Sequence, residues 1–110
     1  MEEQAASSNP FFITASVPAA HEPADPAPQH ASYGKGFKAP RTPNYNYVDS
    51  GSGRHWMVDE VNVEGKGFNE TVESFVDLLY RRRLATLQSV DDMIEEFVNK
   101  LDELGEVRDS

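Results

Sequence analysis

The sequence predicts a mostly α-helical protein in which a disordered N-terminal half precedes a small α-helical hairpin or short coiled coil. All seven prolines lie within the first 43 of the 110 residues. Residues 10–43 have hardly any apolar repeat, so little buried area would offset the entropy of ordering their backbone. Between Asn69 and Leu104, apolar residues instead recur at the spacing of an amphipathic helix.

These differences divide the chain into four parts. Residues 1–54 form a disordered arm rich in Pro, Ala, Gly and Ser, with a basic and aromatic segment at 33–47. Residues 55–68 form an extended strap and hinge, residues 69–105 the helical module, and residues 106–110 a C-terminal tail. The foldable part is close to the lower size limit for a self-sufficient core, so we expect a protein partner or a homo-oligomer.

The net charge of −9 is carried by the helical half, because 14 of the 19 acidic residues lie in residues 55–110. Nucleic-acid-binding folds need a concentrated positive face, so this charge argues against one. The absence of cysteine excludes disulfides and thiolate zinc sites. No apolar run approaches the ~20 residues that span a bilayer, and no secretory signal is recognisable. These features predict an intracellular protein, cytoplasmic or nuclear, with no membrane contact.

The segment 33–47 differs from the rest of the arm because cations and aromatic rings alternate in it. These residues are Tyr33, Lys35, Phe37, Lys38, Arg41, Tyr45 and Tyr47. Rings stack on bases while cations neutralise phosphates, so weak binding of single-stranded nucleic acid is one interpretation. The preferred interpretation is that the arm folds back on the acidic helices or docks on a protein partner as an extended segment.

The strap at 55–68 carries β-branched residues and the single tryptophan, Trp56. Apolar residues occupy every second position in two short runs. The alternation shifts by one position between the two runs. A lone strand is unstable, so we expect the strap to pack on the helices. Trp56 is then the aromatic anchor of the strap, with an interface hot spot as the alternative role.

A first helix begins at Asn69, a favourable N-cap followed by acidic residues in the opening turn. Its apolar face follows the i, i+3, i+4, i+7 spacing: Val72, Phe75, Val76 and Leu79. Arg81–Arg83 lies near the expected C-terminal end, where cations complement exposed carbonyls. Asp77 precedes Arg81 by one turn, which predicts an ion pair within the helix.

A second helix follows Ser89, which with Asp92 resembles a capping box. Its apolar stripe, closed by Gly105, consists of Met93, Ile94, Phe97, Val98, Leu101 and Leu104. One continuous helix is the alternative, because the steps of three and four residues run unbroken from Leu87 to Leu104. The Ser89 cap and the change of apolar phase favour a hairpin with its bend at 86–89, although no glycine or proline enforces that bend.

The sequence shows no arrangement typical of an enzyme. His21, His30 and His55 lie outside the helical part and have no partners at metal-ligand spacing. Glu95 and Glu96 lie among other surface acids, an environment unsuited to general acid–base catalysis. The prediction is therefore no catalysis, no cofactor and no metal site.

Ser89–Val98 resembles the short C-terminal motif of a plant family described as cotton-fibre expressed proteins. In that motif, Val-Asp precedes an acidic pair, an aromatic residue and a branched aliphatic residue. The chain departs from it at Ile94, where a small residue is usual, and at Leu101, where Phe is common. It also has an acidic ending instead of a basic one, so no function is carried over from this resemblance.

The leading functional prediction is a small non-enzymatic regulatory protein that binds a partner, or itself, through the apolar face of the hairpin. The expected apolar contacts are Trp56, Phe75, Val76, Leu79, Ile94, Phe97 and Leu101, and the expected charged contacts are Asp91, Asp92, Glu95 and Glu96. One alternative is an acidic inhibitor or chaperone that mimics phosphates on a nucleic-acid-binding protein. Another is a structural coiled-coil oligomer with disordered arms.

Overall fold

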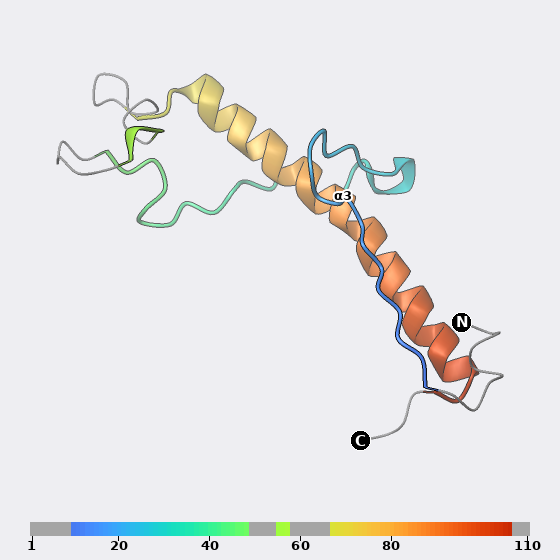
Figure 1. The fold of residues 1–110 in the computed structure, drawn as a ribbon. Coiled ribbons are helices and arrows are strands. Elements are labelled where there is room, and N and C mark those ends of the chain that lie inside the picture. Colours follow the sequence, from blue (N-terminus) through green and yellow to red (C-terminus); the bar gives the residue numbers. More distant parts are fainter. Residues whose placement is uncertain (1–9, 49–54, 58–66, 107–110) are drawn as a thin grey trace.

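The computed structural model describes residues 10–48, 55–57 and 67–106. Its main element is the helix α3, Glu70–Glu103, which is 34 residues long (Figure 1). A short 3-10 helix, η1 (Pro28–His30), lies in the arm that precedes it. The described residues contain no strand, and none of their helices is long and apolar enough to cross a membrane.

Both ends of α3 lie where the sequence places the helix signals. The Asn69 side chain accepts a hydrogen bond from the backbone N–H of Val72 at 3.0 Å and so caps the first turn. At the other end, Gly105 has a φ of 70°. The N–H of Gly105 donates to the carbonyl of Asp102, and that of Glu106 to Leu101, both at 2.9 Å. This is the Schellman arrangement, in which a glycine after the helix closes it.

In place of the predicted hairpin, α3 continues without interruption through residues 86–89. The hydroxyl of Thr86 donates to the carbonyl of Arg82 at 2.8 Å, which adds a bond along the helix. Ser89 is therefore an interior residue of the helix and caps nothing. The physical reason is that residues 70–103 contain no glycine or proline, so no backbone feature ends the helix there.

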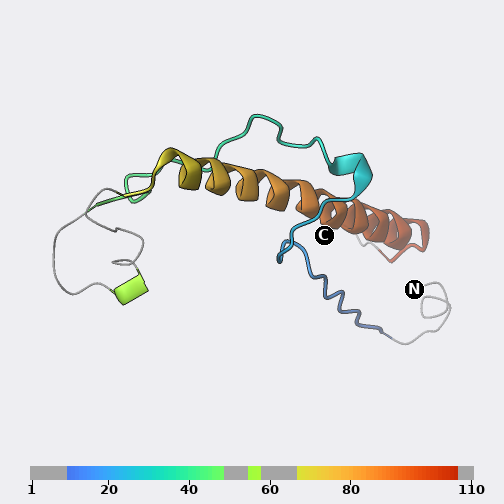
Figure 2. The same cartoon turned by 90° about the horizontal axis from the view of Figure 1, so that it is seen from above.

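The arm is not a disordered tail over residues 10–48, because these residues follow a defined path along α3 in the opposite direction (Figures 1 and 2). Phe11 lies near the C-terminal part of α3, and Asn46 lies at its beginning. The composition of the arm provides no core of its own. Its order comes from polar side chains of α3 that bind its backbone.

No large side chain is fully buried among the described residues. The buried ones are small, Ala24, Ala39 and Ala85, together with Asp77, which is 8% exposed. Trp56 is 62% exposed, so it does not anchor the strap to α3. The rest of the strap at 58–66 lies outside the described residues. The arm and α3 therefore form a layer that leaves much apolar surface uncovered.

Candidate functional site

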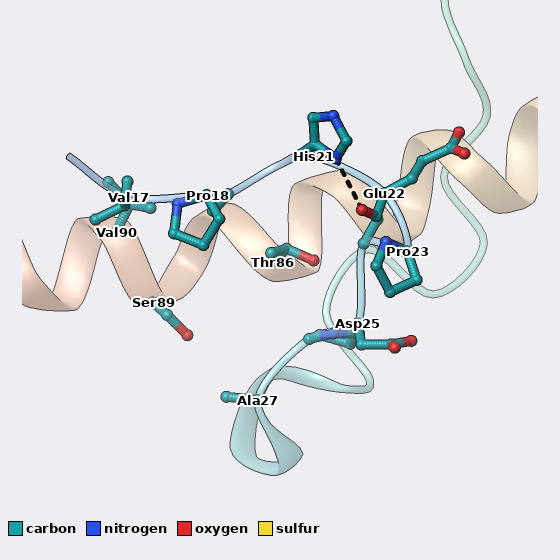
Figure 3. Close-up of a pocket in the computed structure, with 13 residues that line it drawn as sticks. Val17, Pro18, His21, Glu22, Pro23, Asp25, Ala27, Thr86, Ser89 and Val90 are labelled. Atoms are coloured by element: carbon teal, nitrogen blue, oxygen red, sulfur yellow. Dashed lines mark hydrogen bonds between the residues drawn. The ribbon is translucent and has the colours of Figure 1, made fainter.

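The segment of residues 17–27, called here the crossing segment, passes over the middle of α3 and encloses an open cavity with it. The cavity has a volume of about 620 Å³. Most of the crossing segment lines one side, and Thr86, Ser89 and Val90 of α3 line the other (Figure 3). Ligand sites in proteins are commonly concavities of about 300–1,000 Å³.

His21 is the one imidazole in this cavity lining. Its Nδ1 lies 2.8 Å from the carbonyl oxygen of Glu22. A carbonyl only accepts hydrogen bonds, so Nδ1 carries a proton and donates it. Nε2 is left without a partner among the described residues. The ring is exposed and projects from the crossing segment (Figure 3).

Two consecutive arginines of α3 hold the crossing segment in place. Arg82 donates from Nε to the carbonyl of Ala24 at 3.3 Å and also pairs with the carboxylate of Asp25. Arg83 donates from Nε to the carbonyl of Ala20 at 3.1 Å. Ala24 is 1% exposed and has a φ of 52°, a left-handed conformation that non-glycine residues seldom adopt. The backbone on both sides of His21 is thus fixed by α3.

The third arginine of the run binds a more distant part of the arm. Arg81 donates from Nη1 to the carbonyl of Phe37 at 2.9 Å. The sequence predicts that Arg81–Arg83 lies near a helix end, where cations complement exposed carbonyls. In the structure the run lies in the middle of α3, because the helix extends to Glu103. Its function in the fold is to attach separate arm segments to one part of the helix.

Asp77 attaches the next part of the arm. Its carboxylate accepts a hydrogen bond from the N–H of Ala39 at 2.9 Å, and Arg41 Nη2 lies 2.9 and 3.0 Å from its two oxygens. The predicted pair with Arg81 is therefore replaced by a pair with Arg41. Burial raises the pKa of Asp77, but the hydrogen bonds from Ala39 and Arg41 and the charges of Arg41 and Lys38 outweigh it. The net effect lowers the pKa below its ordinary value.

An aromatic cluster ends the arm near the start of α3. The guanidinium of Arg41 lies 4.1 Å from the ring centre of Tyr45, in a cation–π contact. Tyr45 meets Phe68 edge to face at 5.9 Å between ring centres. The N–H of Phe68 donates to Asn46 Oδ1 at 2.6 Å. Within the basic and aromatic segment, these contacts use Arg41 and Tyr45, whereas the following residues are exposed: Tyr33, Lys35, Phe37, Lys38 and Tyr47.

The predicted partner-binding residues are dispersed along α3. Phe75 and Ile94 are more than half exposed, and the others on this helix are partly buried: Val76, Leu79, Phe97 and Leu101. Phe97 and Leu101 line a cavity of about 250 Å³ with residues 11–15 of the arm. The predicted charged contacts are all exposed: Asp91, Asp92, Glu95 and Glu96. Of these, Asp92 lies 2.6 Å from Nε2 of His30.

The sequence does not mark His21 as a site residue, because it has no partner at metal-ligand spacing. Arg82 and Arg83, which hold the backbone on both sides of His21, lie about 60 residues later in the chain. A local sequence pattern cannot predict contacts over that separation. Among the described residues, no group of three or more His, Cys, Asp or Glu side chains could hold a metal ion.

The model of the sulfatase family matches residues 1–110. The chain is 42% identical over 98 residues to the putative extracellular sulfatase Sulf-1 homolog of Caenorhabditis elegans, covering 89% of this chain and 13% of that protein. It is 35% identical over 103 residues to the N-acetylglucosamine-6-sulfatase of Bos taurus, covering 94% of this chain and 18% of the relative. The Homo sapiens N-acetylglucosamine-6-sulfatase is 34% identical over 101 residues, with 92% and 17% covered.

The chain thus spans less than a fifth of the length of these three curated relatives. No solved structure matches it. The match over the whole chain also supersedes the short resemblance of Ser89–Val98 to the cotton-fibre proteins.

These comparisons correct three predictions. The chain is not a non-enzymatic regulatory binder, because its whole length matches a family of enzymes. The exclusion of catalysis is wrong for the same reason, since residues far apart in sequence can form a site that local motifs do not reveal. The intracellular location is wrong, because relatives from two organisms are named extracellular sulfatases, and the lack of cysteine in one segment is weak evidence about compartment. The chain belongs to the sulfatase family.

Proposed function

We propose that the chain forms part of a sulfatase that hydrolyses sulfate esters of N-acetylglucosamine-containing glycans, with His21 in its active site. Support for the substrate comes from the relatives named N-acetylglucosamine-6-sulfatase. Support for the site comes from one observation. His21 is exposed and lines the cavity of about 620 Å³, with Nδ1 donating to the Glu22 carbonyl and Nε2 without a partner among the described residues.

Hydrolysis of a sulfate ester breaks the bond between sulfur and the sugar oxygen. Water supplies the oxygen that replaces it on sulfur, and the sugar oxygen leaves with a proton as an alcohol. The products are the free sugar hydroxyl and hydrogensulfate. The reaction therefore needs donors for the sulfate oxygens and a proton for the leaving oxygen.

A histidine held in this way suits both needs. When its ring is protonated, Nε2–H can donate to a sulfate oxygen or transfer its proton to the leaving sugar oxygen. The Nδ1–H bond to the Glu22 carbonyl fixes the ring orientation and keeps Nε2 as the reactive nitrogen. Arg82 and Arg83 hold the backbone of the crossing segment, so they act as positioning residues.

The test is the His21→Gln variant of the full-length enzyme, assayed by sulfate release from N-acetylglucosamine 6-sulfate. Loss of a positioned acid–base group lowers kcat by about 10²- to 10⁴-fold. His30→Gln is the matched control, because His30 lies on the same arm but contacts Asp92 outside the cavity. Equal kcat values for the two variants would show that His21 is not part of the active site. Absence of sulfate release by the unaltered enzyme would contradict the proposed activity itself.

A further inference from the structure

A second cavity, called here the Lys35 pocket, lies between a turn of the arm and α3. Its volume is about 370 Å³, and its polar lining includes Tyr33, Lys35, Arg81 and Arg82. None of the lining residues is acidic, although the half of the chain that contains α3 holds most of the acidic residues. The pocket is therefore locally positive on an acidic protein.

The two guanidinium groups of the pocket are held by the arm. Arg81 uses one N–H for the carbonyl of Phe37, and Arg82 is held by Ala24 and Asp25. A guanidinium has five N–H donors, so each arginine keeps donors that these bonds do not use. Held donors lose little entropy when they bind an anion, which favours recognition of sulfate or carboxylate oxygens.

Lys35 and Tyr33 supply the open side of the pocket. Both are exposed, and the ammonium group of Lys35 forms no hydrogen bond or ion pair with any described residue. The Tyr33 ring is 44% exposed and stands edge to face with Phe37, at 6.3 Å between ring centres. A ring held this way presents an apolar surface beside a cation that has no partner, a combination suited to a charged sugar.

The Lys35 pocket adjoins the cavity beside His21. Arg82 lines the pocket and donates to the carbonyl of Ala24, a residue that lines the cavity. The N–H of Ala24 in turn donates to the carbonyl of His21 at 2.9 Å. A glycan that occupied the cavity could therefore place a neighbouring sugar unit at the Lys35 pocket.

We propose that the Lys35 pocket is an anion subsite that binds a sulfate or carboxylate group on a sugar unit next to the one whose ester is cleaved. This inference rests on the proposed sulfatase function. The subsite sets a preference for glycans with more than one anionic group and takes no part in breaking the ester.

The binding test uses the chain itself and a sulfated tetrasaccharide that contains N-acetylglucosamine 6-sulfate, titrated by calorimetry. Lys35→Gln should weaken binding by about five- to tenfold, the effect of one charge-assisted hydrogen bond at a partly exposed site. Lys35→Arg should retain most of the affinity. Lys38→Gln is the matched control, because it removes the same charge three residues away, outside the pocket lining. Circular dichroism of each variant checks that α3 is intact.

Equal weakening by Lys35→Gln and Lys38→Gln would overturn the proposal, because it would indicate attraction by net charge alone. A further assay in the full-length enzyme separates the subsite from the activity. Lys35→Gln should raise KM for the tetrasaccharide about five- to tenfold and leave kcat, and the kinetics on N-acetylglucosamine 6-sulfate, unchanged. Unchanged KM for both substrates would overturn the subsite and leave the sulfatase function standing. An inactive wild-type enzyme would refute the proposed activity. The titration would still show whether the Lys35 pocket binds the anionic sugar.

Discussion

Asp77 of α3 and Arg41 of the arm, 36 residues apart, form an ion pair in which Arg41 Nη2 lies within 3.0 Å of both carboxylate oxygens. Arg41 also donates from Nη1 to the carbonyl of Ala39, whose N–H donates to Asp77. The three groups close a ring of hydrogen bonds between the arm and the helix. Because Asp77 is the one buried acid among the described residues, this ring is the main polar link of the layer.

Replacing Asp77 by Asn should release the arm around Ala39. The substitution keeps the shape of the side chain but removes the charge that Arg41 requires, and leaves that cation without its partner. Hydrogen exchange should rise at residues 37–45 and stay unchanged within α3. Asp91→Asn, an exposed acid on the same helix, is the control. Equal exchange in both variants would show that Asp77 does not hold the arm.

Acid should loosen the same contact. The pKa of Asp77 is lower in the folded chain than its ordinary value of 3.8. Its stabilising contribution is therefore complete above that value and is lost as the pH falls through the lower folded pKa. Hydrogen exchange of Ala39, corrected for the intrinsic pH effect, should increase below about pH 4 in the wild type. In Asp77→Asn this step should be absent. A step of equal size in both proteins would assign it to another group.

Gly67→Ala should destabilise the junction between arm and helix by more than 1 kcal/mol, in the upper part of the ordinary ~0.5–3 kcal/mol range of point mutations. A Cβ at this position would lie 2.5 Å from Asn46 Oδ1 and 2.9 Å from Val48 Cγ2. Gly36→Ala is the control, because its φ is also positive but no atom lies within 4 Å of its Cβ. Urea unfolding of both variants separates the clash from the cost of the left-handed conformation. Equal losses would contradict the clash.

Asn69→Ala should shorten α3 from its N-terminal end at a cost of about 1 kcal/mol, the usual value of an N-cap. The lost bond is the one from the N–H of Val72. Thermal unfolding measures the cost, and the chemical shifts of residues 70–73 locate it. Asn69→Asp should keep full stability, since aspartate accepts the same bond and suits the helix dipole. Loss of stability in both variants would mean that Asn69 acts through something other than its cap.

The isolated chain should self-associate or bind an apolar dye through the exposed face of α3. Ile94 and Val98, one turn apart, are 51% and 52% exposed. Burial of such apolar surface against another molecule is favourable in water. The double variant Ile94→Gln, Val98→Gln should shift light scattering towards the monomer and reduce dye fluorescence. Glu95→Gln with Asn99→Gln, on exposed polar positions beside them, is the control. An unchanged mass and dye signal in both double variants would show that the chain associates through a surface other than Ile94 and Val98.

The sequence predicted those features that depend on neighbouring residues. Asn69 and Gly105 mark the ends of α3 because caps act within one turn. The bend at 86–89 was mispredicted, because Ser89 is a permissible cap but does not break a helix with favourable residues on both sides. The arm was mispredicted because its composition contains no core, whereas its order comes from contacts such as Arg81 to Phe37, 44 residues apart. For the site, His21 depends on similar long-range contacts, so the candidate role of that residue could not be read locally.

The run Arg81–Arg83 occupies less than one helical turn, about 3 Å along the axis, yet its members bind Ala20, Ala24 and Phe37 of the arm. The arm between Ala24 and Phe37 therefore forms an excursion along α3, in which His30 contacts Asp92, and returns to nearly the same height. Residues inserted into or deleted from that excursion would change its size without shifting the register of His21 or Arg41 along the helix.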